Sequence, residues 1–232
     1  MSRASHRLSV VVPTLNEAEG IAKFLADLQP LRRRNVEIIL SDGGSRDGTI
    51  AAAAGLADQV IESPMPGRAA QMNAGAAEAR ADILLFLHAD TRLPQLADRS
   101  IIDGLSKRQR QWGRFDVRLS GRAWMLRCVE TLMNLRSRLT GIATGDQAIF
   151  VERRAFESVG GFADIALMED IELSRRLKRL GPPLCLRETV ITSSRRWERD
   201  GIWRTIFFMW SLRLRYFFGA APGQLARRYH GK

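Results

Sequence analysis

The first ninety residues alternate between short apolar runs and stretches with helical spacing, and this pattern limits the fold more than any other feature. The apolar runs cover residues 8–12, 36–40, 59–61 and 83–87, and helical stretches follow the first three of them. None of the runs alternates strictly between polar and apolar residues, so we expect strands that are covered on both sides. The sequence therefore predicts an α/β fold, a mostly parallel, Rossmann-like sheet with helices on both faces.

Polar residues follow each of the four expected strands. In a parallel sheet with right-handed crossovers, these positions meet at one edge, where open α/β sheets bind ligands. Taken singly, Asn16 and Asp47 could be helix caps and Asp42-Gly43 a turn. Four such strand ends in succession favour one shared pocket. The candidate residues are Pro13, Thr14, Asn16, Glu17, Asp42, Gly43, Arg68, His88, Ala89 and Asp90.

The chemistry of these side chains suits a phosphorylated ligand. Asp42 can accept a hydrogen bond from a base or a ribose, and Arg68 opens a helix, where it can bind phosphate. Asp90 offers a hard oxygen ligand for Mg²⁺ or Mn²⁺ on a diphosphate. His88 is a softer second ligand that suits Mn²⁺, although a lone histidine at a strand end more often makes structural hydrogen bonds.

The pattern changes after Asp90. We expect helices over residues 94–107, 122–139 and 153–159, an edge strand over 112–119 and a strand over 148–151. Glu169-Asp170 opens a further helix, where Asp170 could act as a general base or merely favour the helix dipole. Asp146, in a loop marked by glycine, could bind an acceptor or cap that loop.

The charge balance favours anionic partners. The chain carries a net charge of +11, and residues 195–232 contain nine basic against two acidic residues. Its two cysteines, Cys128 and Cys185, lack metal-ligand spacing, which fits a reducing cytosol. The N-terminus has no apolar signal-peptide core, and no apolar run is long enough for a transmembrane helix. We therefore expect a cytoplasmic protein, with the inner face of the membrane as an alternative location.

Several motifs resemble family 2 glycosyltransferases when they are taken in order. Residues 11–17 (VVPTLNE), residues 41–49 (SDGGSRDGT) and the Asp90 loop resemble the nucleotide-sugar half of that family. Gly160-Gly161-Phe162 followed by Glu169-Asp170 resembles its acceptor half. Residues 67–75 and 86–91 are most similar to a small bacterial subfamily named for association with radical-SAM/selenodomain proteins and, in some members, arsenosugar biosynthesis.

The resemblance implies a GT-A fold over residues 1–197, in which residues 8–92 bind the nucleotide sugar and residues 93–197 the acceptor. It implies an inverting transfer with Asp170 as the base and Asp90 as the last Asp of a DxD metal motif. The first Asp of that motif is His88 here. Asn73 joins the nucleotide-sugar residues, and Asp146, Glu169, Arg196 and Trp197 are candidates for acceptor binding. Ser193 stands where processive members carry Gln, which argues against a long-chain polymerase.

The C-terminal residues 198–232 form a basic, aromatic appendage. Within it, residues 202–218 combine a stripe of aromatic and aliphatic side chains with arginines, as in an amphipathic helix. Such a helix can lie on an anionic membrane surface, pack on the domain or join a homodimer.

The expected function is metal-dependent transfer of a sugar from a nucleoside-diphosphate sugar, with a UDP-sugar as first choice, to a small-molecule or lipid-linked hydroxyl acceptor. A nucleotidyltransferase is one alternative, but it would need a glycine-rich basic loop after residue 12. A basic nucleic-acid-binding protein is the other. It would place basic residues across a groove, whereas acidic residues occupy the expected pocket here.

Overall fold

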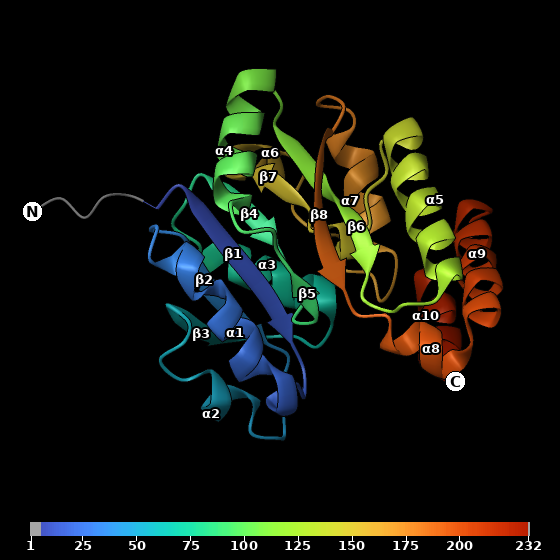
Figure 1. Cartoon of the computed structure of the whole chain (residues 1–232), viewed down its shortest axis with the longest axis horizontal. Coiled ribbons are helices and arrows are strands. Elements are labelled where there is room, and N and C mark those ends of the chain that lie inside the picture. Colours follow the sequence, from blue (N-terminus) through green and yellow to red (C-terminus); the bar gives the residue numbers. More distant parts are fainter. Residues whose placement is uncertain (1–5, 232) are drawn as a thin grey trace, which may run out of the picture.

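The computed structural model describes residues 6–231 and contains an eight-stranded sheet with helices on both faces (Figure 1). Residues 1–5, for which the sequence predicts no signal peptide, and residue 232 lie outside the described part. The strands are β1 (Leu8–Thr14), β2 (Glu37–Asp42), β3 (Gln59–Glu62), β4 (Ile83–Phe86), β5 (Thr91–Arg92), β6 (Trp112–Leu119), β7 (Phe150–Glu152) and β8 (Leu184–Thr192). The helices are α1 (Ala18–Arg32), α2 (Thr49–Ala53), α3 (Arg68–Glu78), α4 (Ala97–Arg108), α5 (Trp124–Thr140), the 3₁₀ turn η1 (Gly145–Gln147), α6 (Arg153–Ser158), α7 (Glu169–Leu177), α8 (Arg195–Asp200), α9 (Ile202–Phe217) and α10 (Pro222–His230).

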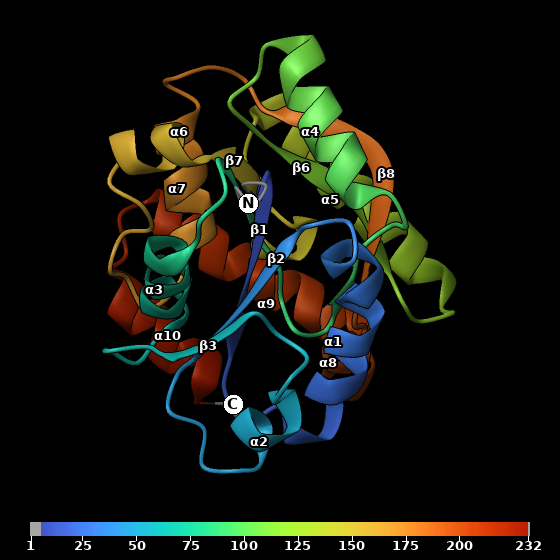
Figure 2. The ribbon, with the colours of Figure 1, turned by 90° about the vertical axis from the view of Figure 1, so that its left-hand side faces the viewer.

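The first half of the chain confirms the expected α/β pattern. β1 pairs in parallel with β2 and β4, and β2 pairs in parallel with β3. Two apolar clusters cover the two faces of the sheet: one is supplied by α1, α4 and α5, and the other by α3, α6 and α7 (Figure 2). The carboxyl ends of β1, β2 and β4 therefore meet at one edge, as predicted.

The second half of the sheet is mixed. β7 runs antiparallel to both β4 and β6, so the sheet is less parallel than the sequence suggests. β6 lies between β7 and β8, and the prediction of an edge strand over residues 112–119 is wrong. Of its polar residues only Arg118 is exposed: Arg114 is fully buried and forms an ion pair with the partly buried Asp116. This internal pairing produces an alternation that resembles a solvated strand.

The C-terminal segment forms three helices rather than one. Leu212 of α9 and Leu225 of α10 are buried together with Met168 and Ile171, at the start of α7. The opposite face of α9 is exposed. In the part of the chain that the structure describes, no helix combines the length and apolar character required to cross a bilayer.

Candidate functional site

A cavity of about 320 Å³ lies where the ends of β1, β4 and β8 meet the start of α7 and the inner face of α9. Residues of both predicted halves line it, together with residues of the C-terminal segment. The predicted residues that line it are Pro13, Glu17, Arg68, His88, Ala89, Asp90, Asp146, Glu169, Asp170, Arg196 and Trp197. The fold thus brings most of the candidate residues to one site.

Other predicted residues build the loops beside the cavity instead of lining it. Asn16 accepts a hydrogen bond from the backbone N–H of Arg46 (2.9 Å), and the backbone N–H of Asn16 donates to Ser45 Oγ (2.8 Å). The carboxylate of Asp47 accepts from the backbone N–H of Ala18 (3.1 Å), at the start of α1. These bonds fasten the loop after β1 to the loop after β2.

Asp42 is fully buried, and its carboxylate stabilises its own loop. Oδ2 accepts hydrogen bonds from the backbone N–H groups of Gly44 (2.9 Å) and Ser45 (2.7 Å), and Oδ1 accepts from the hydroxyl of Ser45 (2.6 Å) and, more weakly, from that of Thr14 (3.4 Å). A Cβ atom at Gly43 would come within 2.6 Å of Gln71 Nε2, so a larger residue there would displace the Gln71 amide from its hydrogen bond to the carbonyl of Thr14. Contacts of these residues with a nucleotide remain predictions.

Asn73 joins the two halves of the chain. Its side-chain amide donates to the backbone carbonyl of Phe162 and accepts from the backbone N–H of the same residue, both at 2.9 Å. The Gly160-Gly161-Phe162 turn is thereby fixed to α3. The predicted role of Asn73 in binding the nucleotide sugar remains a prediction.

Glu17 and Asp90 form an acidic pair on one side of the cavity. Burial raises the pKa of Glu17, and the negative charge of Asp90 raises it further. Among the described residues, no group of three or more His, Cys, Asp or Glu side chains is arranged to hold a metal ion. Mg²⁺ is commonly held by one or two carboxylates together with substrate phosphates. The donor set of Asp90 and Glu17 fits a cation of that kind.

His88 points toward Asp146. Nδ1 of His88 lies 3.7 Å from Oδ1 of Asp146, and a Cβ atom at Gly145 would come within 2.5 Å of the imidazole ring. Burial raises the pKa of Asp146, but His88, Arg68 and Arg213 outweigh that effect and lower it on balance. His88 therefore stabilises a carboxylate in this structure, and its role as a metal ligand remains a prediction.

Arg68 and Glu169 form an ion pair in the wall of the cavity. Nη1 of Arg68 lies 3.7 Å from Oε1 of Glu169, whose side chain is 8% exposed. Burial raises the pKa of Glu169, and the neighbouring Asp170 raises it further, whereas Arg68 opposes both effects. Arg68 is half exposed and remains accessible to a phosphate.

Asp170 is fixed at the start of α7. Oδ2 accepts a hydrogen bond from the backbone N–H of Gly145 (2.8 Å), and Oδ1 accepts from that of Ile171 (2.7 Å). A carboxylate oxygen has lone pairs for more than one such bond. The group is therefore well oriented and can still accept a proton.

The short strand β5 brings the C-terminal segment to the cavity. Thr91, next to Asp90, pairs with Thr192 at the end of β8, and their hydroxyl groups lie 3.0 Å apart. Arg196 and Trp197 follow at the cavity wall. The guanidinium of Arg196 stacks over the ring of Tyr229, 3.8 Å from its centroid.

Several residues of the site are not part of the motifs from which the site was predicted. Thr205, Met209 and Arg213 of α9 and Tyr229 of α10 line the cavity. Thr205, Met209 and Arg213 are four residues apart in sequence and so share one face of a helix. The four-residue spacing could have predicted a second face of this helix that lines the cavity. The aromatic stripe on the same helix is the stronger pattern and drew the prediction to the other face.

Solved structures share this fold. S. aureus TarS 1–349 in complex with UDP superposes with a TM-score of 0.67 at 16% identity, over 81% of this chain and 60% of that one. The chain spans 36% of the longer TarS structure. A mannosyltransferase of Pyrobaculum calidifontis in complex with GDP-Man and Mn²⁺ gives 0.60 at 20% identity, over 82% and 59% of the two chains. Glucosyl-3-phosphoglycerate synthase of Mycobacterium tuberculosis gives 0.58 at 20% identity, over 81% and 71%.

Sequence comparison defines the family. An uncharacterised glycosyltransferase of Mycobacterium tuberculosis is 27% identical, over 91% of this chain and 86% of its own length. The family model described as glycosyl transferase family 2 matches residues 9–151, more than half of the chain. That span contains the loops after β1, β2 and β4 and ends at β7. The chain therefore belongs to glycosyltransferase family 2 and is a glycosyltransferase.

Proposed function

We propose that this glycosyltransferase moves a sugar from a nucleoside-diphosphate sugar, with a UDP-sugar as first choice, to a hydroxyl acceptor with inversion at the anomeric carbon. The observation that carries the proposal is that Asp90, Arg68 and Asp170, which come from three separate parts of the chain, line one cavity. The structural neighbours support the donor class, since they were solved with UDP, UDP-GlcNAc and GDP-Man.

The donor occupies the side of the cavity formed by the ends of β1 and β4. Pro13 and Glu17 border the nucleotide there, and the guanidinium of Arg68 donates hydrogen bonds to the diphosphate. Asp90, with Glu17 beside it, would hold a divalent cation, as the Mn²⁺ in two neighbour complexes suggests. A cation at that position supplies charge stabilisation of the departing diphosphate.

Asp170 acts as the general base. It takes the proton of the acceptor hydroxyl while the hydroxyl oxygen forms a bond to the anomeric carbon, on the face opposite the diphosphate. The bond between that carbon and the diphosphate oxygen breaks, and the nucleoside diphosphate leaves with the electron pair. No covalent enzyme intermediate is needed. Asp146, Glu169, Arg196 and Trp197 surround the acceptor on this side of the cavity.

The motifs over residues 67–75 and 86–91 favour the radical-SAM/selenodomain-associated subfamily. Arg68, which belongs to the first of these motifs, contributes a positively charged side chain to the cavity. The turn after α6 is fixed by Asn73. Residues 1–197 would form the catalytic domain, and residues 198–232 an appendage that completes its pocket.

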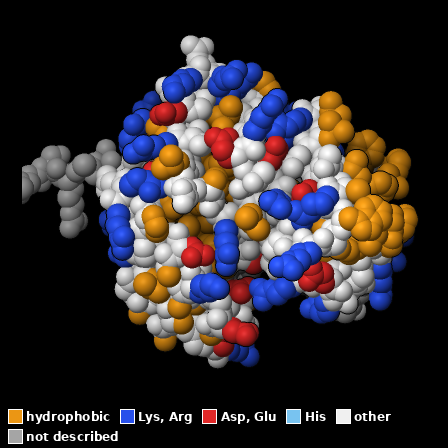
Figure 3. Space-filling view, in the orientation of Figure 1, with side chains coloured by type: hydrophobic (Ala, Val, Ile, Leu, Met, Phe, Trp, Pro, Cys, Tyr) orange, Lys and Arg blue, Asp and Glu red, His pale blue; other side chains and the backbone are white. Residues whose placement is uncertain are grey.

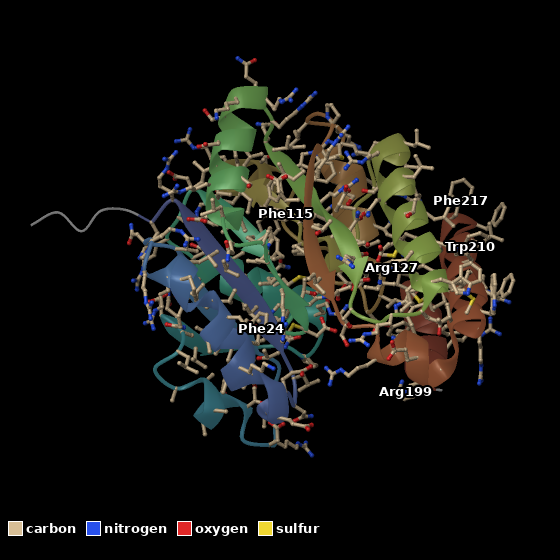
Figure 4. All side chains as sticks on the ribbon, viewed as in Figure 1. Phe24, Phe115, Arg127, Arg199, Trp210 and Phe217 are labelled. Atoms are coloured by element: carbon tan, nitrogen blue, oxygen red, sulfur yellow. The ribbon has the colours of Figure 1, made fainter. Side chains whose placement is uncertain are left out.

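We also infer that the protein binds peripherally to the inner face of the membrane. The exposed sides of α5 and α9 form the membrane-binding surface. Figure 3 displays the hydrophobic patch at this end of the molecule, and in Figure 4 Trp210 and Phe217 point away from the body of the protein. The exposed apolar residues are Trp124, Leu132, Leu135, Leu139, Trp203, Phe207, Trp210, Leu214, Phe217 and Phe218. Tryptophan and phenylalanine beside arginines are typical of interfacial helices, and the net charge of +11 favours anionic lipids.

A thermal-shift screen tests the donor class. Wild-type protein is heated with UDP-, GDP- and dTDP-sugars in the presence of Mn²⁺ or Mg²⁺. A donor at about 100 times its dissociation constant should stabilise the fold by about 2.7 kcal/mol. Stabilisation by one nucleotide class supports the proposal, and the absence of any shift at millimolar concentration would contradict it.

A further inference from the structure

Two arginines approach the Asp170 end of the cavity from neighbouring helices. Arg213 lies on the inner face of α9 and lines the cavity. Arg136 lies on α5, which packs beside α9, three residues after the buried Met133 (Figure 1). Burial lowers the pKa of Arg136 to about 10, and the positive charge of Arg213 is the next cause. The positive charge of Arg213 thus disfavours the charged form of Arg136.

Within the described part of the chain, neither guanidinium group has a hydrogen-bond acceptor or an ion-pair partner. Nε and Nη2 of Arg136 and Nε of Arg213 are sealed from water and donate to no acceptor. No carboxylate of residues 6–231 comes within 4.0 Å of either guanidinium. Buried N–H donors without an acceptor destabilise a fold, and like charges on two partly buried side chains add to that cost.

The carboxylates of the cavity are engaged elsewhere. Glu169 faces Arg68, and Asp146 faces His88, each at 3.7 Å. Both oxygens of Asp170 accept backbone hydrogen bonds. Neither Asp146 nor Asp170 therefore forms a direct ion pair with Arg136 or Arg213, and their negative charges only partly offset the effect of burial on the pKa of the two arginines.

We propose that Arg136 and Arg213 form a phosphate-binding subsite for the acceptor, so that this enzyme glycosylates a phosphorylated molecule. The inference rests on the proposed function and names its acceptor class. A phosphate in the cavity would contact Arg213 directly, and Arg136 behind it would add charge. Two guanidinium groups match the double charge and the several acceptor oxygens of a phosphomonoester.

The position of the pair assigns it to the acceptor rather than to the donor. Arg213 lies on α9, which packs on the start of α7 where Asp170 stands, and both residues line the cavity. Asp170 and Asp146 partly offset the effect of burial on the pKa of Arg213. Glu17 and Asp90 instead line the cavity beyond the ends of β1 and β4. A phosphate at Arg213 would thus lie beside the base and apart from the proposed cation site.

Inorganic phosphate is the first probe. At constant ionic strength it should raise the melting temperature of the wild-type protein in a saturable manner. Arg213→Gln should weaken phosphate affinity by about tenfold or more, because it removes a charge-assisted contact, and Arg136→Gln should weaken it less. The matched control is Arg215→Gln, which removes an exposed arginine from the same helix. Phosphate affinity that falls equally in all three variants, or no phosphate effect on the wild type, would overturn the proposal.

A second measurement remains informative if a glutamine variant folds poorly. Without phosphate, Arg136→Met should melt at a higher temperature than the wild type, because it removes a buried charge and its unpaired donors. A lower melting temperature would mean that Arg136 has a stabilising partner, against the proposal.

Titration with UDP and Mn²⁺ separates this inference from the proposed function. The two glutamine variants should bind UDP as the wild type does; a loss of UDP affinity would assign the arginines to the donor and overturn the inference. If the wild type itself binds no nucleotide, the proposed function fails, whatever the phosphate result. Glycerol 3-phosphate and a short-chain phosphatidic acid then distinguish the source of the phosphate. Equal affinity indicates a soluble acceptor, and preference for the phosphatidic acid indicates a lipid phosphate.

Discussion

At the scale of single residues, the cavity depends on how its carboxylates are held. Asp170 is held by two backbone N–H groups, whereas Glu169 is buried against Arg68. Adjacent residues of a helix point about 100° apart, so the two carboxylates face different partners. This difference supports Asp170 as the base and Glu169 as a residue that supports the site.

Asp170→Asn tests the base. The amide cannot take a proton, so transfer should fall by about 10²–10⁴-fold. The NH₂ group of the introduced asparagine would also face the backbone N–H of Gly145 or of Ile171, two donors without an acceptor between them. The loss of that hydrogen bond should lower the free energy of unfolding by about 1–3 kcal/mol. Turnover, UDP affinity and the free energy of unfolding are measured together, with Asp164→Asn, an exposed loop change, as the control. Near-normal turnover would eliminate Asp170 as the base, and lost UDP affinity would make it a donor or metal ligand.

The pH dependence of stability tests the environment of Glu169. Its folded-state pKa is raised above 4.5, so the folded state favours the protonated carboxyl. The resulting stabilisation is present below pH 4.5 and is lost as the pH rises through the raised pKa. Glu169→Gln stays neutral, so its stability relative to the wild type should increase across that window. Glu157→Gln, on the exposed side of α6, is the control. A difference that does not change with pH would contradict the burial effect.

At the scale of elements, local sequence was enough for the first four strands but not for the later ones. The runs in β1, β2 and β4 are apolar because both faces are covered, and helices directly follow β1 and β2. β8 was missed because Arg187 and Glu188 interrupt it, and its pairing with β6 depends on contacts across some seventy residues. The buried pair of Arg114 and Asp116 made β6 resemble an edge strand.

The close contact of α3 with β1 predicts that only glycine fits at position 75. A Cβ atom at Gly75 would lie 2.4 Å from Cγ1 of Val11, whereas one at Gly20 in α1 would meet nothing within 4 Å. Gly75→Ala should destabilise the fold by about 1–3 kcal/mol through overpacking. Gly20→Ala should stabilise it by about 0.5–1 kcal/mol. Chemical denaturation measures both, and a Gly75→Ala protein as stable as the wild type would contradict the close packing of α3 on β1.

The outer face of α9 is the element proposed to meet the membrane. Deleting residues 203–232 would also remove Thr205, Met209 and Arg213 from the cavity wall, so point changes are cleaner. Phe207→Ser with Trp210→Ser should reduce flotation with anionic liposomes while UDP affinity is kept. Leu180→Ser, at an exposed leucine beyond α7, is the control. Unchanged flotation, or concentration-dependent dimerisation that the double variant abolishes, would assign this face to another role.

At the scale of the whole molecule, the sequence motifs predicted where the strand ends meet but not what closes the cavity. Asp90, Arg68 and Asp170 were identifiable because each stands at the end or the start of an element. Arg136 and Arg213 carry no such signal, since an arginine in an amphipathic helix usually faces water. The packing of α9 on the start of α7 brings Arg213 to the cavity, and Arg136 lies on α5, the helix beside α9.

The account rests on a cation-assisted nucleotide site at Asp90, and calorimetric titration of UDP with and without Mn²⁺ tests it most directly. The wild type should bind UDP more tightly with Mn²⁺. Asp90→Ala should lose most of that gain, because the variant lacks the carboxylate that would bridge the cation to the protein. Asp82→Ala, an exposed change just before β4, should behave as the wild type does. An Asp90→Ala protein that keeps the full effect of Mn²⁺ on UDP affinity would contradict the account.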